Sequence, residues 1–398
     1  MKKKNNFTRR EFLEIGGLGA MGLIMAQNAI SQSEIFTKKM LLYIGTYTST
    51  GKSEGIYVHE FDATNGKLTP LHIVKNVLEP SFLTISKDRK HLYAVNELLE
   101  YEGKKSGAVS AFSIDQKTGN LQFLNKQPSL GGAPCHISIT EDGEFVLVAN
   151  YLGGNVSVYP IEKDGKLGAS VDLVQHSGFG PNKDRQEAAH AHSINLVIPN
   201  RFACAADLGI DKIMIYRFDE KTGKLTTNEN QPFYQSKAGS GPRHLTFHHN
   251  GKYCFVINEL DLTVSSLAFD NKLGTLTEIQ TVPTLPAGAS TAGVTCADIH
   301  ISPNGKFLYG SNRGHNSIVS YKIDGPSGRL EYIEHTPTQG KKPRNFAIDP
   351  SGKFLLVANQ DSNNIVVFRI DEETGKLQST GNTVQVPTPV CLKFIAAF

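Results

Sequence analysis

The stretch PRNFAIDPSGKFLLVAN at residues 343–359 decides the fold, because variants of it recur along most of the chain. The shared pattern is P-x-x-L-x-I, a gap of five or six residues, and F-L-x-V-A-N. Clear copies also occupy residues 80–96, 134–150, 242–258 and 296–312, a weaker copy occupies 191–207, and half-copies occupy 41–46 and the tail from Pro389. Successive copies begin roughly 46 to 57 residues apart. A repeat near this length is typical of a solenoid or a propeller.

Each repeat has room for four short strands. In the quoted copy, residues 344–349 and 353–359 form the first two strands, residues 364–371 form the third, and a fourth starts near Leu377. Four-stranded repeats of this length indicate the blades of a β-propeller. The alternative, a β-helix, has coils that are shorter and less varied in length. Trp is absent, so the tryptophan-aspartate repeats of WD40 propellers are excluded.

The two incomplete copies complete each other. Residues 41–46 lack the inner strand that the tail PTPVCLKF, residues 387–394, can provide. We therefore expect strands from both termini to close one shared blade, which removes exposed sheet edges. The prediction is an all-β protein in which residues 40–398 form one seven-bladed β-propeller domain.

The first 36 residues do not fit the repeat. Lysines at positions 2–4 precede the segment TRREFL at residues 8–13, and a Gly/Ala/Leu/Met-rich stretch continues to about residue 30. These features predict a twin-arginine-type signal peptide over residues 1–36 and export to the periplasm. The alternative is an amphipathic tail or a retained membrane anchor, but the apolar run is short and rich in glycine.

The composition narrows the classes of partner and cofactor. The formal net charge is only +3, with no basic stripe, so a nucleic-acid partner is not expected. The five cysteines form no C-x-x-C pair and their number is odd, which favours buried free thiols over disulfides or structural zinc. We find no Gly-rich phosphate loop or nucleophile elbow, and we expect no cofactor.

Equivalent positions of the repeats can be compared, counting from the first residue of each copy, here called the anchor. Three and five residues after the anchor the side chains are apolar, and we expect them to pack between blades. Two and four residues after it they are mostly polar, and we expect them to line a water-filled central channel. The polar positions include His136, His244, Asp298, His300 and Asn345, and we predict that these five residues bind substrate.

A second comparison locates the mouth of this channel. Because the first two strands of a blade are antiparallel, the residue after the anchor and the residue after the closing Asn emerge at the same end. The first set is Ser81, Cys135, His192, Arg243, Ala297, Arg344 and Val390; the second is Tyr47, Glu97, Tyr151, Leu208, Glu259, Arg313 and Gln360. Insertions at 97–106, 176–190 and 284–295 join strands at this end and should wall the opening.

Adjacent blades place a distinctive set of side chains at this mouth: His192, Arg243, Glu259 and Arg313. Singly, charged residues at strand ends are more often structural than functional, but a symmetric fold has no structural need for such a cluster. A concave site with convergent polar groups is the expected binding site. Arg344 and Gln360 occupy the corresponding positions nearby and are further candidates for substrate binding.

His190 and His192, together with Glu187 and His136, also allow a metal site to be considered. No spacing motif supports that interpretation, and two ligands would come from an insertion. We therefore predict no metal ion and assign His190 to substrate binding.

On these residues the chain resembles the seven-bladed lactonase family typified by bacterial 6-phosphogluconolactonase. The resemblance spans roughly residues 41–398. It is most specific in GPRH (241–244), VINEL (256–260) and ADIHISP (297–303), with support from APCHIS (133–138) and HAHS (190–193). Related fungal muconate-lactonizing enzymes have a His, two Arg and a Glu as proposed active-site residues. Matched motif by motif, these correspond to His192, Arg243, Glu259 and Arg313.

The resemblance implies hydrolysis of a small sugar-derived lactone to the aldonic acid, without a cofactor. His192 or Glu259 would act as general base on water, and His192 is favoured because two flanking arginines would acidify Glu259. Arg243 and Arg313 would hold the substrate and stabilise the oxyanion. The alternatives are a muconate-type cycloisomerase and a non-catalytic exported propeller that binds a sugar acid or a protein. The export signal departs from the family, because phosphorylated sugar lactones are made in the cytoplasm, so the particular lactone stays open.

Overall fold

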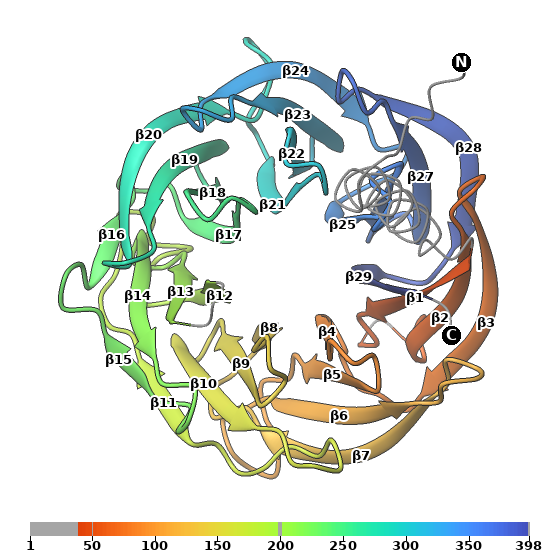
Figure 1. Cartoon of the computed structure of the whole chain (residues 1–398), viewed down its shortest axis with the longest axis vertical. Helices are drawn as coiled ribbons and strands as arrows, with labels where there is room; N and C mark the ends of the chain where they lie inside the picture. The colour runs from red at the N-terminus through yellow and green to blue at the C-terminus, as the bar shows by residue number, and fades with distance from the viewer. Residues whose placement is uncertain (1–38, 50, 198–200, 397–398) are drawn as a thin grey trace, which may run out of the picture.

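The computed structural model describes residues 39–49, 51–197 and 201–396, and these residues form strands joined by turns. Seven sheets are arranged around a central axis, as Figure 1 shows, which confirms the predicted all-β, seven-bladed propeller. The predicted signal peptide at residues 1–36 lies outside the described residues. Within the described ranges, no helix is long and apolar enough to cross a membrane.

The blades are numbered here in chain order by their inner strands. Blade 1 contains β4 (Leu83–Ile85), β5 (His91–Asn96), β6 (Ala108–Ile114) and β7 (Leu121–Pro128), and blade 2 contains β8 (Pro134–Ile139), β9 (Phe145–Asn150), β10 (Asn155–Pro160) and β11 (Asp172–Gln175). Blade 3 contains β12 (Ala191–Val197), β13 (Phe202–Asp207), β14 (Lys212–Phe218), β15 (Leu225–Thr227) and β16 (Phe233–Gln235), and blade 4 contains β17 (Pro242–Phe247), β18 (Tyr253–Asn258), β19 (Thr263–Asp270) and β20 (Thr275–Pro283). Blade 5 contains β21 (Thr295–Ile301), β22 (Phe307–Arg313), β23 (Ser317–Ile323) and β24 (Leu330–Pro337), and blade 6 contains β25 (Pro343–Ile348), β26 (Phe354–Asn359), β27 (Asn364–Ile370) and β28 (Leu377–Gln385). Blade 7 contains β29 (Pro389–Ala396), β1 (Lys39–Thr46), β2 (Gly55–Asp62) and β3 (Lys67–Lys75).

Blade 7 is built from both ends of the chain, as predicted. The last strand, β29, is its inner strand and pairs antiparallel with β1. In this register Leu42 lies opposite Phe394, and Ile44 lies opposite Leu392. This pairing closes the ring of blades, and Figure 1 shows β29 next to β1.

Blade 3 departs from the predicted four strands. Its outer strand is broken in two, and both β15 and β16 pair with β14. At the break, Asn228 donates from its side chain to the carbonyl oxygens of Leu273 and Gly274 in the neighbouring blade, at 2.9 Å each. At the break in the outer strand of blade 3, the chain therefore hydrogen-bonds to the turn between β19 and β20 of blade 4.

The predicted apolar face of the inner strands is confirmed. The side chains three residues after each anchor are buried between neighbouring blades: Leu83, Ile137, Ile194, Leu245, Ile299, Phe346 and Leu392. Each belongs to an apolar cluster that joins the strands of two or three adjacent sheets. Burial of these faces holds successive blades together.

Several inner strands carry a β-bulge at the residue directly after the anchor. The pairing with the second strand skips Cys135 in blade 2, His192 in blade 3, Arg243 in blade 4 and Arg344 in blade 6. In a strictly alternating strand this residue would share the apolar face between blades. A bulge breaks the alternation and re-aims the side chain, so these residues reach the mouth of the channel.

Below the mouth, the polar side chains expected to line an open channel are packed against one another. His136, His244, Asp298 and Asn345, two residues after their anchors, are all buried. The ring centroids of His136 and His244 are 5.5 Å apart, and Asn345 Nδ2 lies 2.5 Å from Asp298 Oδ2. Phe82, the equivalent residue of blade 1, packs on His136 with a centroid distance of 4.5 Å. In this packed layer, Asp298 accepts hydrogen bonds from His244, His300 and Asn345, so several of the facing polar side chains pair with one another.

Candidate active site

A cavity of about 320 Å³ lies at the predicted mouth of the channel. Its lining residues are Tyr47, Glu97, Cys135, Tyr151, Arg185, His192, Glu259, Arg313 and Arg344. Three of the four predicted catalytic residues are among them, and Arg243 is buried directly behind Glu259. Of the insertions expected to wall the opening, 97–106 contributes Glu97 and 176–190 contributes Arg185, whereas none of the lining residues comes from 284–295.

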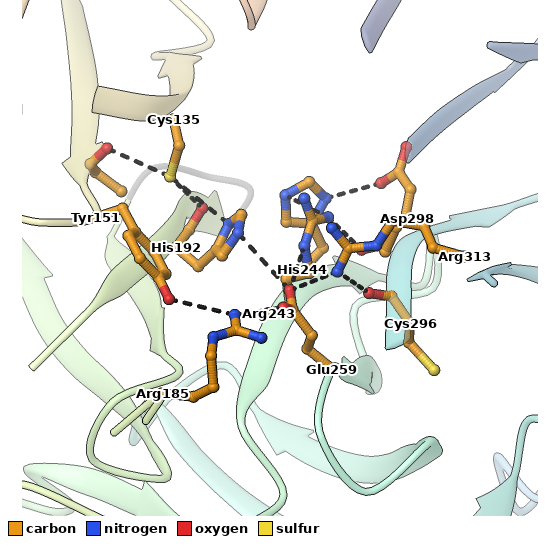
Figure 2. Close-up of polar contacts among 12 residues, drawn as sticks. Cys135, Tyr151, Arg185, His192, Arg243, His244, Glu259, Cys296, Asp298 and Arg313 are labelled. Atoms are coloured by element: carbon orange, nitrogen blue, oxygen red, sulfur yellow. Dashed lines mark hydrogen bonds and ion pairs between the residues drawn. The ribbon is translucent and has the colours of Figure 1, made fainter. Parts of the chain in front are cut away.

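Glu259 is the centre of the charge network, as Figure 2 shows. Its Oε2 lies 2.9 Å from Arg243 Nε and 2.9 Å from Arg313 Nη2, and its Oε1 lies 2.6 Å from Arg185 Nη2. Burial raises the pKa of Glu259, but the three guanidinium groups outweigh burial and lower the pKa to about 2. Glu259 is therefore ionised at neutral pH, with both oxygens engaged.

His192 faces this carboxylate without a direct hydrogen bond. Its Nε2 lies 4.0 Å from Glu259 Oε2, and its Nδ1 lies 3.6 Å from the Sγ atom of Cys135. Burial, together with the charge of Arg243 and neighbouring groups, holds the pKa of His192 well below its ordinary value. The imidazole is therefore neutral at pH 7 and can accept a proton.

Cys135 orients His192 rather than competing with it. Its Sγ lies 3.3 Å from the backbone oxygen of His192, and a thiol that donates to this nearest carbonyl oxygen turns its lone pairs toward Nδ1 of His192. Burial raises the pKa of the Cys135 thiol, so it remains protonated and is a poor nucleophile. This arrangement favours the tautomer of His192 in which Nε2 carries the lone pair and faces the cavity.

Arg243 and Arg313 are fixed by backbone carbonyl groups as well as by Glu259. Arg243 Nη1 donates to the carbonyl oxygen of Ala297, and Arg313 Nη2 donates to that of Cys296 at 2.7 Å. Burial and the nearby arginines lower the pKa of Arg243 to about 10, which leaves it charged at neutral pH. Guanidinium groups held in this way are preorganised donors for a developing negative charge.

Arg344 lines the same cavity from blade 6, next to the blade that carries Arg313. Its guanidinium lies 5.3 Å from the centroid of the Tyr47 ring, and the hydroxyl of Tyr47 donates to Glu97 Oε2 at 2.9 Å. Among the residues that the structure describes, none forms a hydrogen bond or an ion pair with the Arg344 side chain. Its donors are therefore available to a ligand.

The cavity carries a positive charge. Four arginines (185, 243, 313 and 344) meet two glutamates (97 and 259) there, so the sum is +2 even when both carboxylates are ionised. Burial raises the pKa of Glu97, although Arg344 opposes that rise. A confined positive site attracts anionic ligands.

Most of the predicted substrate-binding residues lie outside the cavity. Of that set only Arg344 is a lining residue; the others are His136, His190, His244, Asp298, His300, Asn345 and Gln360. His190 is buried beneath Tyr151, on which it stacks with a centroid distance of 4.5 Å. The rest belong to the packed layer or to the strand ends around it.

Part of that packed layer supports Arg243. His244 Nε2 lies 3.3 Å from Arg243 Nη1, and His244 Nδ1 lies 2.8 Å from Asp298 Oδ1. The second oxygen of Asp298 accepts from His300 at 2.9 Å and from Asn345. Burial first, and then the charge of Arg243, lowers the pKa of His244 to about 4, so the neutral ring accepts from Arg243 and donates to Asp298.

Arg185 is the site residue that the sequence comparison missed. It lies in an insertion, so no equivalent position in other repeats marks it. Tyr47, Glu97, Cys135 and Tyr151 were also not predicted as site residues, although all four belong to the two sets that emerge at the mouth. The insertion 176–190 was predicted to reach the mouth, and Arg185 is the arginine within it, which was the available signal.

The histidines of the mouth do not converge on a common point as metal ligands would. The ring nitrogens of His190 lie 3.0 Å from the carbonyl oxygen of Tyr151 and 3.0 Å from Glu187 Oε1. No group of three or more His, Cys, Asp or Glu side chains suited to a metal ion occurs in the described part of the chain.

A second depression of about 500 Å³ lies at the other end of blades 3 and 4, lined by residues 195–197, 245–249 and 251. Its walls are the far ends of β12 and β17 and the turn after β17. No carboxylate or guanidinium group lines it. The charged cavity at the mouth is therefore the candidate active site.

Comparison with known proteins identifies the family of the chain. Residues 41–394 match the family model described as "Lactonase, 7-bladed beta-propeller". The chain is 38% identical over 357 residues to the 6-phosphogluconolactonase of Bacillus subtilis, which covers 90% of this chain and 99% of that protein. It is 40% identical over 309 residues to the 6-phosphogluconolactonase of Formosa agariphila, covering 77% of this chain and 85% of that protein.

A solved structure also matches at full length. The periplasmic gluconolactonase of Pseudomonas aeruginosa superposes with a TM-score of 0.84 at 34% identity, covering 90% of this chain and 100% of that one. The match extends over all the blades, and the family model includes the segments that carry His192, Arg243, Glu259 and Arg313. The chain therefore belongs to the lactonase family of seven-bladed β-propellers.

Proposed function

We propose that this protein is a lactonase that hydrolyses a sugar-derived lactone to its aldonic acid. The observation that carries the proposal is one cavity in which a neutral, buried imidazole faces a carboxylate and several fixed guanidinium groups. Its relatives are named 6-phosphogluconolactonase and gluconolactonase. Hydrolysis of this class of lactone is the chemistry that these groups and these relatives share.

His192 is proposed as the general base. Its Nε2 takes a proton from a water molecule, whose oxygen attacks the lactone carbonyl carbon. The ring C–O bond then breaks, and the imidazolium returns the proton to the departing alkoxide oxygen. The carboxylic acid formed ionises and releases one proton for each ring opened. A positioned base of this kind contributes roughly 10²- to 10⁴-fold to the rate.

Arg243 and Arg313 are proposed to stabilise the tetrahedral oxyanion. Each is already fixed by Glu259 and by a carbonyl oxygen, so little reorganisation is needed when charge develops. Glu259 then acts as the group that orients both arginines. With a pKa of about 2 and its oxygens occupied, it is a weaker candidate than His192 for the base.

Arg344 is proposed to bind an anionic substituent of the substrate. Its guanidinium has no ion-pair partner among the described residues, and it shares the cavity with His192. A phosphate or a carboxylate on the sugar would complete its hydrogen bonds. The net positive charge of the cavity favours an anionic lactone over a neutral one.

Export to the periplasm is proposed as the location. The predicted twin-arginine-type signal at residues 1–36 supports it, as does the word periplasmic in the name of the Pseudomonas relative. The test is cell fractionation of the wild-type protein and of the Arg9→Lys/Arg10→Lys variant. Periplasmic wild-type protein with a retained variant is the expected result, and equal distributions would contradict it.

The activity is tested by pH-stat titration of purified protein with 6-phosphogluconolactone and with unphosphorylated gluconolactone. Proton release above the spontaneous rate is expected, and it should be faster with the phosphorylated substrate. His192→Ala and Arg243→Met, checked for folding by circular dichroism, serve as inactive controls. A protein that is silent across a panel of lactones, or variants with wild-type turnover, would overturn the proposal.

A further inference from the structure

We infer that Asp207 is a positioning residue of the active site, which ties together the two ends of the insertion 176–190 and so holds Arg185 in the cavity. The kinetic part of this inference rests on the proposed lactonase activity. Its structural part, the attachment of the insertion, can be measured without any substrate.

Asp207 breaks the repeat at the position where the other five copies have Asn. In four of those copies the Asn side chain donates to a backbone carbonyl of the segment that leads into the blade. The pairs are Asn96 with Leu78, Asn150 with Ser129, Asn312 with Thr284 and Asn359 with Thr338. A carboxylate has no N–H group to donate, so blade 3 uses this position differently.

Asp207 accepts hydrogen bonds from both ends of the insertion. Its Oδ2 lies 2.6 Å from Nδ1 of His176, and its Oδ1 accepts from the backbone N–H of His190 at 2.7 Å. The side chains of His176 and Asp207 are fully buried. Tyr216 completes the network, since its hydroxyl lies 2.8 Å from His176 Nε2. The carboxylate of Asp207 therefore holds the first and last residues of the insertion, His176 and His190, close together.

A second attachment lies next to Arg185. The fully buried side chain of Gln186 donates to the carbonyl oxygen of Leu208 at 2.8 Å and to Asp211 Oδ1 at 2.7 Å. Asp211 also accepts from the backbone of Gly241, which precedes the strand that carries Arg243. The close approach of the segments depends on Gly209, because a Cβ atom there would lie 1.9 Å from the carbonyl oxygen of Ala188.

These attachments matter because Arg185 has no strand to hold it. The other three arginines of the cavity lie on β17, β22 and β25. Arg185 reaches Glu259 at 2.6 Å and the hydroxyl of Tyr151 at 3.3 Å, with 36% of its side chain exposed. Its placement over the cavity therefore depends on the path of the insertion, and the remaining N–H groups are positioned to contact substrate.

The test compares Asp207→Asn with Arg185→Met and with the double variant. Asp207→Asn restores the residue of the other repeats at almost unchanged volume but presents an amide to the donors of His176 and His190. We expect each single change to lower kcat/KM by about tenfold to a hundredfold, the range for loss of a hydrogen bond to a charged group. The double variant should fall no further, because both changes remove the same placement of Arg185.

Hydrogen exchange supplies the readout that does not depend on activity. In Asp207→Asn we expect the amides of residues 176–190 to exchange at least about tenfold faster, with the other blades unchanged. Asp349→Asn is the matched control. Asp349 is equally buried and accepts a hydrogen bond from the backbone N–H of Phe354 at 2.7 Å. It lies in the turn after β25 of blade 6, at the end of the channel away from the mouth. It should leave both kcat/KM and exchange of the insertion unchanged.

The outcomes separate this inference from the proposed function. Losses that multiply in the double variant, or exchange that rises equally in all blades, would overturn the positioning role. If the wild-type protein hydrolyses no lactone, the proposed function fails, and the exchange of residues 176–190 still decides the role of Asp207. Should Asp207→Asn not fold, Tyr216→Phe removes one hydroxyl from the same network, and it must show the same selective pattern at smaller amplitude.

Discussion

Replacing Glu259 by Gln removes the charge that Arg185, Arg243 and Arg313 share while keeping the shape of the side chain. The pKa of Glu259 lies at about 2 instead of the ordinary 4.5, and one pKa unit corresponds to about 1.36 kcal/mol. The ionised form is thus favoured by about 3 kcal/mol after the cost of burial. That figure agrees with the roughly 3–5 kcal/mol lost when one partner of a buried ion pair is removed.

Thermal unfolding measures this loss. The propeller spans about 360 residues, and unfolding entropy is about 2.1 cal/mol/K per residue, or roughly 0.75 kcal/mol/K in total. A loss of about 3 kcal/mol therefore lowers Tm by about 4 °C at pH 7. Because the folded pKa is depressed, the stabilisation is complete above the unfolded pKa near 4.5 and disappears as pH falls toward 2. The difference in Tm between wild type and variant should shrink over that range.

The same variant tests the assignment of the base. If the full 3 kcal/mol serves to orient the arginines, kcat/KM falls by at most about a hundredfold, and His192 still accepts the proton. Glu229→Gln, at an exposed position, is the control and should change neither Tm nor activity. A Tm within about 1 °C of wild type would refute the electrostatic reasoning. Complete loss of activity in Glu259→Gln, beside an active His192→Ala variant, would make Glu259 the base.

Three further predictions follow from the site. His192→Ala should lower kcat by about 10²- to 10⁴-fold with KM little changed, and a folded variant with wild-type turnover in the pH-stat would contradict the assignment. Only the neutral imidazole of His192 can act as the base, and its pKa is held well below 6.5. We therefore expect kcat/KM to stay level between pH 7.5 and 6.5 and to fall only at lower pH. A fall centred near pH 6.5 would count against His192 as the base. Arg344→Met should raise KM for 6-phosphogluconolactone about tenfold or more and leave gluconolactone nearly unaffected, whereas equal effects on the two substrates would exclude an anion contact.

The fold could be predicted from the sequence because one physical requirement repeats along the chain. Each inner strand buries the side chain three residues after its anchor and half-buries most of those five residues after it. The period of this pattern predicts the number of blades, and the half-copies at the two ends predict the closure. The broken outer strand of blade 3 was not predicted. It depends on Asn228 contacting a turn of the next blade, and such a contact leaves no period in the sequence.

The candidate site was predicted in part. His192, Glu259, Arg243 and Arg313 were found because equivalent positions emerge at one end of every blade. The β-bulges that turn His192 and Arg243 toward the channel were not foreseen, since strict alternation predicts the opposite face. His136 and Asp298 were assigned to substrate binding from their polarity alone, but they satisfy neighbouring side chains inside the packed layer instead. The polarity of a residue shows that it faces the channel, but it does not show whether the residue lies near enough to the mouth to contact a ligand.

The pairing of β1 with β29 also sets how the molecule folds. Met40 lies opposite Ala396, so this contact has one of the longest sequence separations in the chain. Contacts of that kind carry a large loop-closure cost and form slowly. Blades 1 to 6 can pack on one another as the chain is synthesised, but the ring closes only after the last strand has left the ribosome. Once closed, the ring has no free end from which to fray, and unfolding must begin by breaking this pairing or a complete face between two blades. Closure by the final strand is therefore the expected slow step of folding, and its pairing with β1 is one of the two kinds of contact at which unfolding can begin.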